Sequence, residues 1–342
     1  LILIGLRASQ VHAASGDAPV VPQSSQSLPS PPDWTMDLVW GEGNYYVADA
    51  FYADPERYPI VGGQRTWNWS ELEAADGVYN WGSMDYWLSQ QAAQGKAAAI
   101  GISAYNGTCC GGIKVPEYIS SNPDLVITAS GGHVIPKYWH PVYKAKYQRF
   151  VRALGIRYRN HPALSWVALG SGLFGETWAC KPADLEFLQA AGLDSELWVD
   201  TVHDFIDYYV DAFSEDGQRK QVLMVQNAPF TFGAGERREI GLYAVEKGVG
   251  FSLNALYPDQ EGAIHGWDSS CVYCGVHDLT SIYGGVLPTT YETYDYMLCD
   301  PTQVYWGLLN GLDKHVDSFR LNIDLFKEGV VGPCLLYTSP SP

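Results

Sequence analysis

The chain has 342 residues, of which 46% are hydrophobic, and a formal net charge of −17 from 21 basic and 38 acidic side chains. This acidic balance argues against nucleic acid or an anionic membrane as a partner, because both are bound by a basic face. No apolar run is long enough to cross a membrane, so we expect no membrane insertion.

The two ends of the chain are predicted to lie outside the folded domain. Residues 1–14 join an apolar stretch to a small-residue site at Val11-His12-Ala13-Ala14, which is typical of the end of a signal peptide. Residues 15–33 are rich in Ser and Pro and predict a disordered linker. Residues 334–342, CLLYTSPSP, resemble a translated sequencing adaptor. We therefore expect a secreted or periplasmic protein with one domain at 34–333, truncated at its C-terminal end.

From residue 34 onward, strand-like and helix-like segments alternate, which predicts a parallel sheet covered by helices. The predicted strands are 36–40, 61–67, 97–103, 164–170, 221–227, 249–255, 285–291 and 317–322. The predicted helices include 82–94, 141–159, 195–213, 236–247 and 301–311. Eight strands in this length favour the α/β class and a single (β/α)8 barrel. An open doubly wound sheet is the alternative, but no glycine-rich phosphate loop supports it.

Six cysteines precede residue 334, and an even number behind an expected signal peptide indicates disulfides. They are Cys109, Cys110, Cys180, Cys271, Cys274 and Cys299, all in predicted loops that follow strands. Their pairing is left open. The Cys271-Val-Tyr-Cys274 spacing resembles half of a zinc site, but no second such pair follows it. We therefore expect no metal and no cofactor.

Two glutamates follow predicted strands, at the position of catalytic residues in (β/α)8 barrels. In ALSWVALGSGLFGETW, residues 163–178, an apolar run breaks into glycines and then delivers Glu176. Glu292 has a similar setting in GGVLPTTYETYDYM. Catalytic side chains of (β/α)8 barrels lie just past the carboxyl ends of strands. Two such carboxylates predict acid/base catalysis on a glycosidic bond.

Two further motifs resemble a known group of enzymes. Residues 69–85 read W-x3-E-x3-G-x-Y-x-W-x3-D, and Arg157-Tyr158 is followed by His161-Pro162 before the fourth predicted strand. Over residues 36–325 the chain resembles the clan A glycoside hydrolases, which are retaining (β/α)8 enzymes. The resemblance implies that Glu176 is the acid/base and Glu292 the nucleophile.

One position departs from that clan. Most members have Asn directly before the acid/base glutamate, where it binds the sugar 2-hydroxyl, and this chain has Gly175. The chain is therefore most similar to uncharacterised β-galactosidase-like families with a G-x-x-G-E-W pattern. Asn227 or Asn254, each near the end of a predicted strand, is expected to supply the missing amide.

The other predicted site residues would orient the nucleophile or bind sugar. Arg65, on the second predicted strand, is expected to hold Glu292 ionised through charge-assisted hydrogen bonds. The predicted sugar-stacking aromatic residues lie near strand ends and are Trp67, Trp178, Tyr257 and Tyr294. Tyr257 is alternatively expected to hydrogen-bond the nucleophile, and Glu261 and Asp295 are the alternative carboxylates.

These features predict a secreted retaining glycoside hydrolase that cleaves a neutral oligo- or polysaccharide by double displacement. A non-catalytic carbohydrate-binding barrel is the alternative, and the missing Asn before Glu176 favours it. A structural envelope or adhesion domain, which would have no deep cleft, is a third interpretation. The expected partner is a carbohydrate, and the sequence gives no prediction of the oligomeric state.

Overall fold

The computed structural model describes residues 38–40, 62–227, 229–258, 275–293 and 301–322. The predicted signal-peptide remnant, the linker and the adaptor-like tail lie outside these residues. In the part of the chain that the structure describes, no helix is long and apolar enough to span a membrane.

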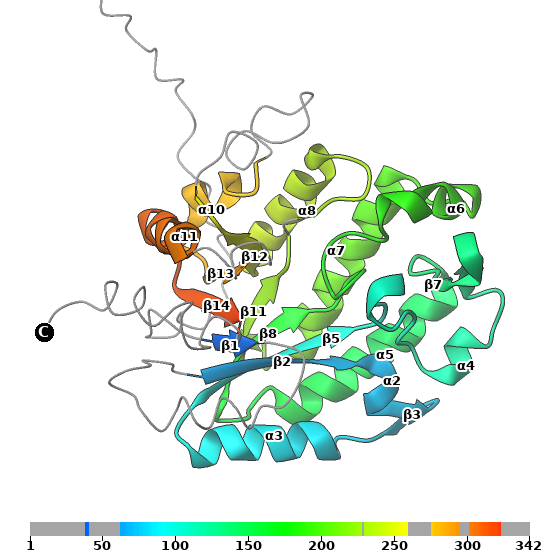
Figure 1. The fold of residues 1–342 in the computed structure, drawn as a ribbon. Helices are drawn as coiled ribbons and strands as arrows, with labels where there is room; N and C mark the ends of the chain where they lie inside the picture. Colours follow the sequence, from blue (N-terminus) through cyan, green and yellow to red (C-terminus); the bar gives the residue numbers. More distant parts are fainter. Residues whose placement is uncertain (1–37, 41–61, 228, 259–274, 294–300, 323–342) are drawn as a thin grey trace, which may run out of the picture.

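Eight parallel strands form a closed barrel, which confirms the predicted fold (Figure 1). Their order around the barrel is β1-β14-β13-β12-β11-β8-β5-β2. The bounds are β1 Leu38–Trp40, β2 Gly62–Asn68, β5 Ala97–Ser103, β8 Leu164–Leu169, β11 Val222–Val225, β12 Gly250–Leu256, β13 Thr289–Thr293 and β14 Ser318–Asn322. Each strand overlaps one of the eight predicted strands.

The seventh strand differs most from its prediction. Gly285 has a φ of 76°, and the amide of Val286 donates to the carbonyl of Tyr283, so the chain turns before Pro288. β13 therefore begins at Thr289 and continues to Thr293, four residues later than predicted at its start. Glu292 consequently lies within the strand rather than past its end.

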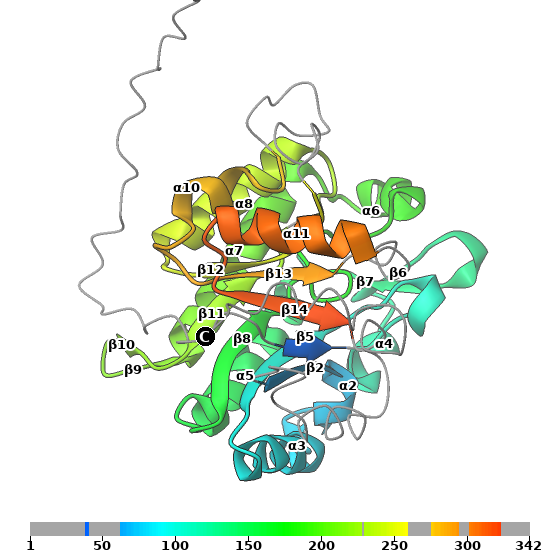
Figure 2. The ribbon, with the colours of Figure 1, turned by 60° about the vertical axis from the view of Figure 1, so that its left-hand side comes forward.

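Helices connect the barrel strands and lie on the outside of the barrel (Figures 1 and 2). The longer ones are α3 Gly82–Ala93, α5 Pro141–Tyr158, α7 Ser195–Ala212, α8 Ala234–Glu246 and α11 Pro301–Asp313, and each matches a predicted helix. The shorter helices are α2 Trp69–Leu72, α4 Glu117–Ser120, α6 Leu185–Ala190 and α10 Asp278–Tyr283. Among the described residues, three hairpins lie outside the barrel: β3 Glu73–Ala75 with β4 Val78–Tyr79, β6 Val126–Thr128 with β7 Val134–Pro136, and β9 Ser214–Glu215 with β10 Gln218–Arg219.

The sequence of α5 accounts for both its start and its packing. Pro141 occupies the first turn, where its missing N–H costs nothing, and the His140 ring accepts a hydrogen bond from the amide of Val142. Its buried residues recur at helical spacing toward the barrel. Near its end, a Cβ on Gly155 would lie 2.3 Å from the carbonyl oxygen of Ala212. The glycine therefore lets α5 and α7 approach closely.

Side chains fill the barrel in two chemical layers. Ala99, Trp166, Val222 and Met224 form a small apolar cluster separate from the large core between strands and helices. Strand residues alternate between the two faces of the sheet. The next inward position is therefore two residues further along each strand, nearer its carboxyl end, as Gln226 is after Met224. The polar side chains of the candidate site lie there, above this apolar floor.

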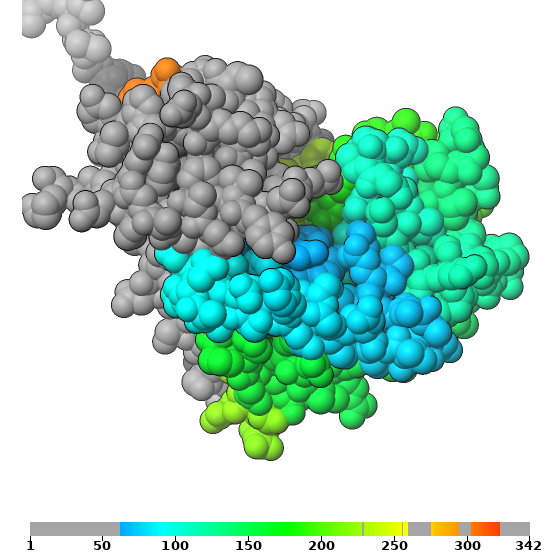
Figure 3. Space-filling view, turned by 60° about the horizontal axis from the view of Figure 1, so that its bottom comes forward, coloured from blue at the N-terminus to red at the C-terminus, as the bar shows by residue number. Residues whose placement is uncertain are grey.

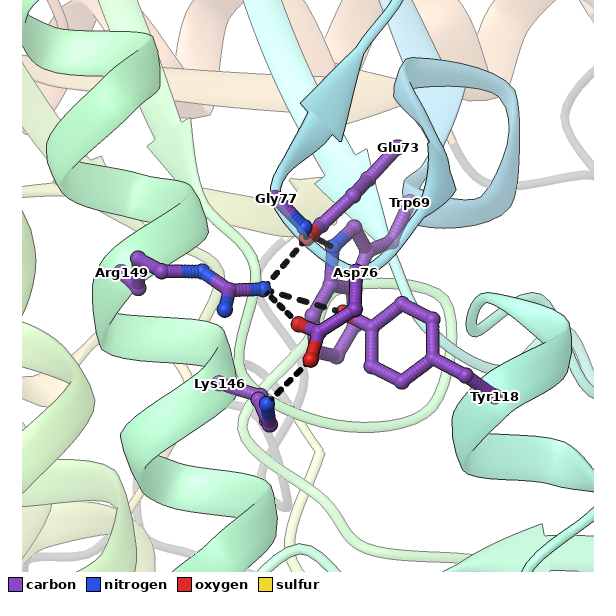
Figure 4. A network of polar contacts seen from close by, with 7 residues as sticks. All are labelled: Trp69, Glu73, Asp76, Gly77, Tyr118, Lys146 and Arg149. Carbon is purple, nitrogen blue, oxygen red and sulfur yellow. Dashed lines mark hydrogen bonds and ion pairs between the residues drawn. The ribbon is translucent and has the colours of Figure 1, made fainter.

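The first resemblance motif forms a polar network outside the barrel (Figure 4). The Glu73 carboxylate accepts hydrogen bonds from the indole of Trp69 at 2.8 Å, the amide of Gly77 at 2.7 Å and Arg149 at 2.6 Å. Arg149 also pairs with Asp76. Because Arg149 belongs to α5, the network fastens the β3–β4 hairpin to that helix.

The end of the motif and the Arg157-Tyr158 pair are partners of each other. Asp85 on α3 accepts hydrogen bonds from Arg157 at 2.5 Å and from the Tyr158 hydroxyl at 2.7 Å. This contact ties α3 to α5. In Figure 3, residues of the α2–α3 segment, in blue and cyan, form one surface with the teal segment that follows β5. The resemblance motifs thus build the packing around the barrel.

Candidate active site

Glu176 is delivered by a tight loop after β8. The carbonyl of Glu176 accepts hydrogen bonds from the amide of Gly172 and the hydroxyl of Ser171, both at 2.8 Å. A Cβ on Gly172 would lie 2.1 Å from the carbonyl oxygen of Trp178, so only glycine fits. The loop then returns to the sheet, where the amide of Thr177 donates to the carbonyl of Gln226 at 3.0 Å. Glu176 is therefore fixed beside β11.

The glycine before Glu176 has a structural cause. Gly175 has a φ of 83°, in the left-handed region that favours glycine, and a Cβ there would lie 2.8 Å from the carbonyl oxygen of Ile102. An Asn at this position would be strained and crowded. The backbone at position 175 therefore accounts for the departure from the clan's Asn.

Glu292 lies on β13 and pairs with a cation from the neighbouring strand. Glu292 is 6% exposed, and its Oε2 lies 2.5 Å from Nη1 of Arg320, which is 5% exposed. The two residues are direct partners in the register of β13 and β14. Such a pair keeps the carboxylate charged in an environment where an isolated charge would be costly.

Gln226, just past the end of β11, bridges the two glutamates. Its Nε2 donates to Oε1 of Glu176 at 3.2 Å and to Oε2 of Glu292 at 2.9 Å. Because one nitrogen contacts both oxygens, those oxygens are separated by no more than the sum of the two distances. The two predicted carboxylates are therefore brought together at one mouth of the barrel.

Asn254 on β12 completes the contacts of Glu176. Its Nδ2 donates to Oε1 of Glu176 at 2.8 Å, while among the described residues no donor reaches Oε2. Burial and the nearby charge of Glu292 raise the pKa of Glu176 to about 7, and the hydrogen bonds from Asn254 and Gln226 oppose this rise. Since Oε1 already accepts two N–H groups, a proton on this carboxyl belongs on Oε2.

Arg65 and Trp67 do not lie where the sequence predicted. The guanidinium of Arg65 stacks over the Trp67 ring, 4.7 Å from its centroid. Trp67 is fully buried against Trp87 of α3, and its indole donates to Ser83 at 3.1 Å. Both side chains therefore face the helix layer, because residues two apart on a strand share a face. Arg320 takes the place expected for Arg65 beside Glu292.

Asn227 contacts α8, and Tyr257 packs against His277. Asn227 accepts from the Thr177 hydroxyl at 3.2 Å and donates to the carbonyl of Arg237 at 2.9 Å, so it joins the Glu176 loop to α8. It also lines a small cavity between α8, β12 and α10. The ring of Tyr257 packs against His277 at 5.3 Å and is 8% exposed, which leaves little surface for a sugar.

Trp178 remains a candidate for sugar stacking. It is partly exposed two residues after Glu176, and the ammonium of Lys181 lies over its ring at 4.6 Å.

Other predicted residues lie outside the described residues: Tyr294, Glu261, Asp295, Cys271, Cys274 and Cys299. The sulfur atoms of adjacent Cys109 and Cys110 face each other, and Cys180 is a buried thiol. Within the described ranges, no group of three or more His, Cys, Asp or Glu side chains is arranged to hold a metal.

Sequence reasoning missed Gln226, Arg320 and Ser252. The Ser252 hydroxyl donates to Oε1 of Gln226 at 2.9 Å, and Arg320 donates to the same oxygen at 2.6 Å. A signal was present, because the strands of a parallel barrel are buried on both faces and read as apolar runs. Two polar residues interrupt these apolar runs: Arg320 in DSFRLN and Gln226 at the end of VLMVQ. A buried polar side chain needs a hydrogen-bonding partner, so both residues could have been identified as candidates for the site.

Comparison with known proteins supports this description. Residues 65–183 match the glycoside hydrolase family 42 profile, described as β-galactosidase. The catalytic domain of a β-amylase from Paenibacillus polymyxa is similar with a TM-score of 0.58 at 9% identity, over 85% of this chain and 92% of that chain. Endo-glycoceramidase II from a Rhodococcus species has a TM-score of 0.51 at 11% identity, over 86% and 75%. A search of curated proteins gave no match.

The two structural likenesses show the fold, since their sequence identities are low. The profile match includes the Trp69–Asp85 motif, the Arg157-Tyr158 pair and the loop that carries Glu176. Together with the closed barrel, this match over about a third of the chain points to the clan A glycoside hydrolases and supports a glycosidase.

Proposed function

We propose that this glycosidase acts with retention, with Glu176 as the acid/base and Glu292 as the nucleophile. The observation that carries the proposal is the single amide nitrogen of Gln226 that contacts both carboxylates. Because one oxygen of each carboxyl lies within hydrogen-bond distance of the same nitrogen, the arrangement favours the carboxyl separation of about 5–5.5 Å of retaining enzymes over the about 6.5–9.5 Å with which inverting enzymes admit a water.

The electrostatics support different roles for the two glutamates. Glu176 has a pKa raised to about 7, so much of it keeps its proton near neutral pH. Glu292 pairs with Arg320, which favours its charged form. A protonated carboxyl and a carboxylate on the same substrate bond are the acid and the nucleophile of a double displacement.

In the first step, a Glu292 oxygen forms a bond to the anomeric carbon while the bond to the leaving oxygen breaks. The proton on Oε2 of Glu176 passes to that oxygen, and an alcohol departs. In the second step, a water attacks the anomeric carbon, its proton returns to Glu176, and Glu292 leaves as a carboxylate. The net reaction consumes one water for each glycosidic bond, and the sugar keeps its anomeric configuration.

The proposed substrate is a neutral carbohydrate, consistent with the strongly acidic chain. The match to a family described as β-galactosidase makes aryl β-galactosides the first substrates to test. A non-catalytic sugar-binding barrel is the second candidate, and the glycine at position 175 favours it. The amide of Asn254 on Glu176 weakens that argument, because it offers a donor from another strand.

The test compares the unmodified protein with Glu176→Gln and Glu292→Gln on a panel of aryl glycosides. We expect turnover to fall at least ~100-fold in both variants, and the anomer first detected by NMR to match that of the substrate. An inverted product would contradict the nucleophilic role of Glu292. Sugar binding without turnover in the unmodified protein would support the binding barrel instead.

A further inference from the structure

The orientation of the Gln226 amide is dictated by its neighbours. Arg320 Nη1 lies 2.6 Å from one terminal atom of this side chain, and the Ser252 hydroxyl lies 2.9 Å from the same atom. A guanidinium only donates hydrogen bonds, so the atom that faces it must be the amide oxygen. The NH2 group therefore points at the carboxylates, and a flipped amide would leave two donors opposed.

The NH2 group of Gln226 has more acceptors than hydrogens. It lies 2.6 Å from Oδ1 of Asn254, 2.9 Å from Oε2 of Glu292 and 3.2 Å from Oε1 of Glu176. Two hydrogens cannot serve three acceptors equally, so the two carboxyl oxygens compete for the hydrogen that Asn254 does not take, and the stronger bond goes to the oxygen with the more negative charge. With Glu176 protonated and Glu292 ionised, Glu176 is the weaker acceptor, in agreement with its longer distance.

During the reaction, Glu176 becomes a stronger hydrogen-bond acceptor than Glu292. Once Glu292 is esterified by the sugar, it carries no charge, while Glu176 has given up its proton and is a carboxylate. The same N–H group then has its better acceptor on Glu176 without any movement of the backbone. Gln226 is 7% exposed and its carbonyl accepts from the amide of Thr177 at 3.0 Å, so its main chain holds the Glu176 loop as well.

We propose that Gln226 is a positioning residue that fixes the separation of Glu176 and Glu292 and transfers its hydrogen bond between them as their charges alternate. The inference rests on the proposed two-glutamate function. The amide donor between the two carboxylates comes from the residue just past β11.

Gln226→Met removes the amide at nearly constant volume, and Gln226→Glu replaces the donor with a third carboxyl. The matched control is Gln221→Met, since Gln221 is a buried glutamine at the start of the same strand segment whose amide donates to the carbonyl of Arg159 at 3.1 Å. It loses one buried hydrogen bond without touching either glutamate. The measurement is kcat, KM and kcat/KM against pH, with the aryl glycoside that the unmodified chain hydrolyses.

In Gln226→Met we expect kcat/KM to fall about 10-fold to 100-fold, mostly through kcat, because a hydrogen bond to charged groups is lost. The alkaline limb of the profile should move to higher pH, since the Gln226 hydrogen bond lowers the pKa of Glu176. Gln226→Glu should move it further in the same direction, because it places another carboxyl beside Glu176. Gln221→Met should leave the limb in place.

An unmoved alkaline limb in both Gln226 variants, or an equal shift in Gln221→Met, would overturn the inference. Gln226→Glu keeps the size and polarity of the side chain, so it provides the answer if Gln226→Met does not fold. The proposed function fails separately: in that case Glu176→Gln and Glu292→Gln retain turnover, whatever the Gln226 variants do.

Discussion

Glu73 and Glu176 are both held by several donors, but they differ in what is left of each carboxylate. Both oxygens of Glu73 accept hydrogen bonds, and the residue is fully buried opposite an arginine. Glu176 has one oxygen bonded twice and the other without a donor in the described part of the chain, and it faces a second carboxylate. A carboxylate with all acceptors filled stabilises the fold, whereas one with an open oxygen near a like charge is prepared for proton transfer.

The largest effect expected from this comparison is on stability at the Glu73 network. Arg149→Met should destabilise the fold by about 3–5 kcal/mol, because it leaves a fully buried carboxylate without its cation. Glu73→Gln should cost less, since the Arg149 side chain is 39% exposed and keeps its pairing with Asp76. Urea unfolding of the two variants measures both values. If both variants lost the same stability, or if kcat fell in the protein that remains folded, the conclusion that this network is purely structural would be wrong.

The second effect is a gain in stability on substitution of Glu176, and its size depends on pH. The pKa of Glu176 is raised from 4.5 to about 7 in the folded protein, so the folded state binds this proton more tightly than the unfolded state. Stability is therefore lost as pH rises from 4.5 to 7. Glu176→Gln keeps an oxygen acceptor and is never charged, so at pH 8 it should be more stable than the unmodified chain by about 3 kcal/mol.

The check is the difference in unfolding free energy between Glu176→Gln and the unmodified chain, measured by urea unfolding at several pH values. Near pH 4 the glutamate is mostly protonated in both the folded and the unfolded state, so the difference should shrink toward zero. The other titrating groups are common to both proteins and largely cancel in the difference. A gain of the same size at pH 4 and pH 8 would mean that shape, rather than charge, is responsible.

The sequence was sufficient for the barrel and for bringing Glu176 and Glu292 together, because both follow from strand patterns and from glycines that only a tight loop requires. It was insufficient for the partners of the glutamates. The sequence points to Asn227 and not to its neighbour Gln226, because one residue along a strand reverses the face and no motif reports that register. The sequence points to Arg65 on β2 as the partner of Glu292, whereas the ion pair with Arg320 depends on the β13–β14 register.

The smallest expected effect separates two asparagines that the sequence could not rank. Asn227→Ala removes a buried amide that joins Thr177 to the carbonyl of Arg237, so it should cost about 1–3 kcal/mol of stability and leave kcat/KM of the folded protein nearly unchanged.

Asn254→Ala removes a donor to Glu176 from a partly exposed position. It should cost less stability than Asn227→Ala, reduce kcat/KM by about 10-fold and raise the pH of the alkaline limb, because the hydrogen bond from Asn254 lowers the pKa of Glu176. Urea unfolding and pH–rate profiles on both variants give a two-way comparison in which each residue serves as the control for the other. If Asn227→Ala moved the alkaline limb, the loop that carries Glu176 would depend on its link to α8, and the division between the structural and the chemical side of β11 would be wrong.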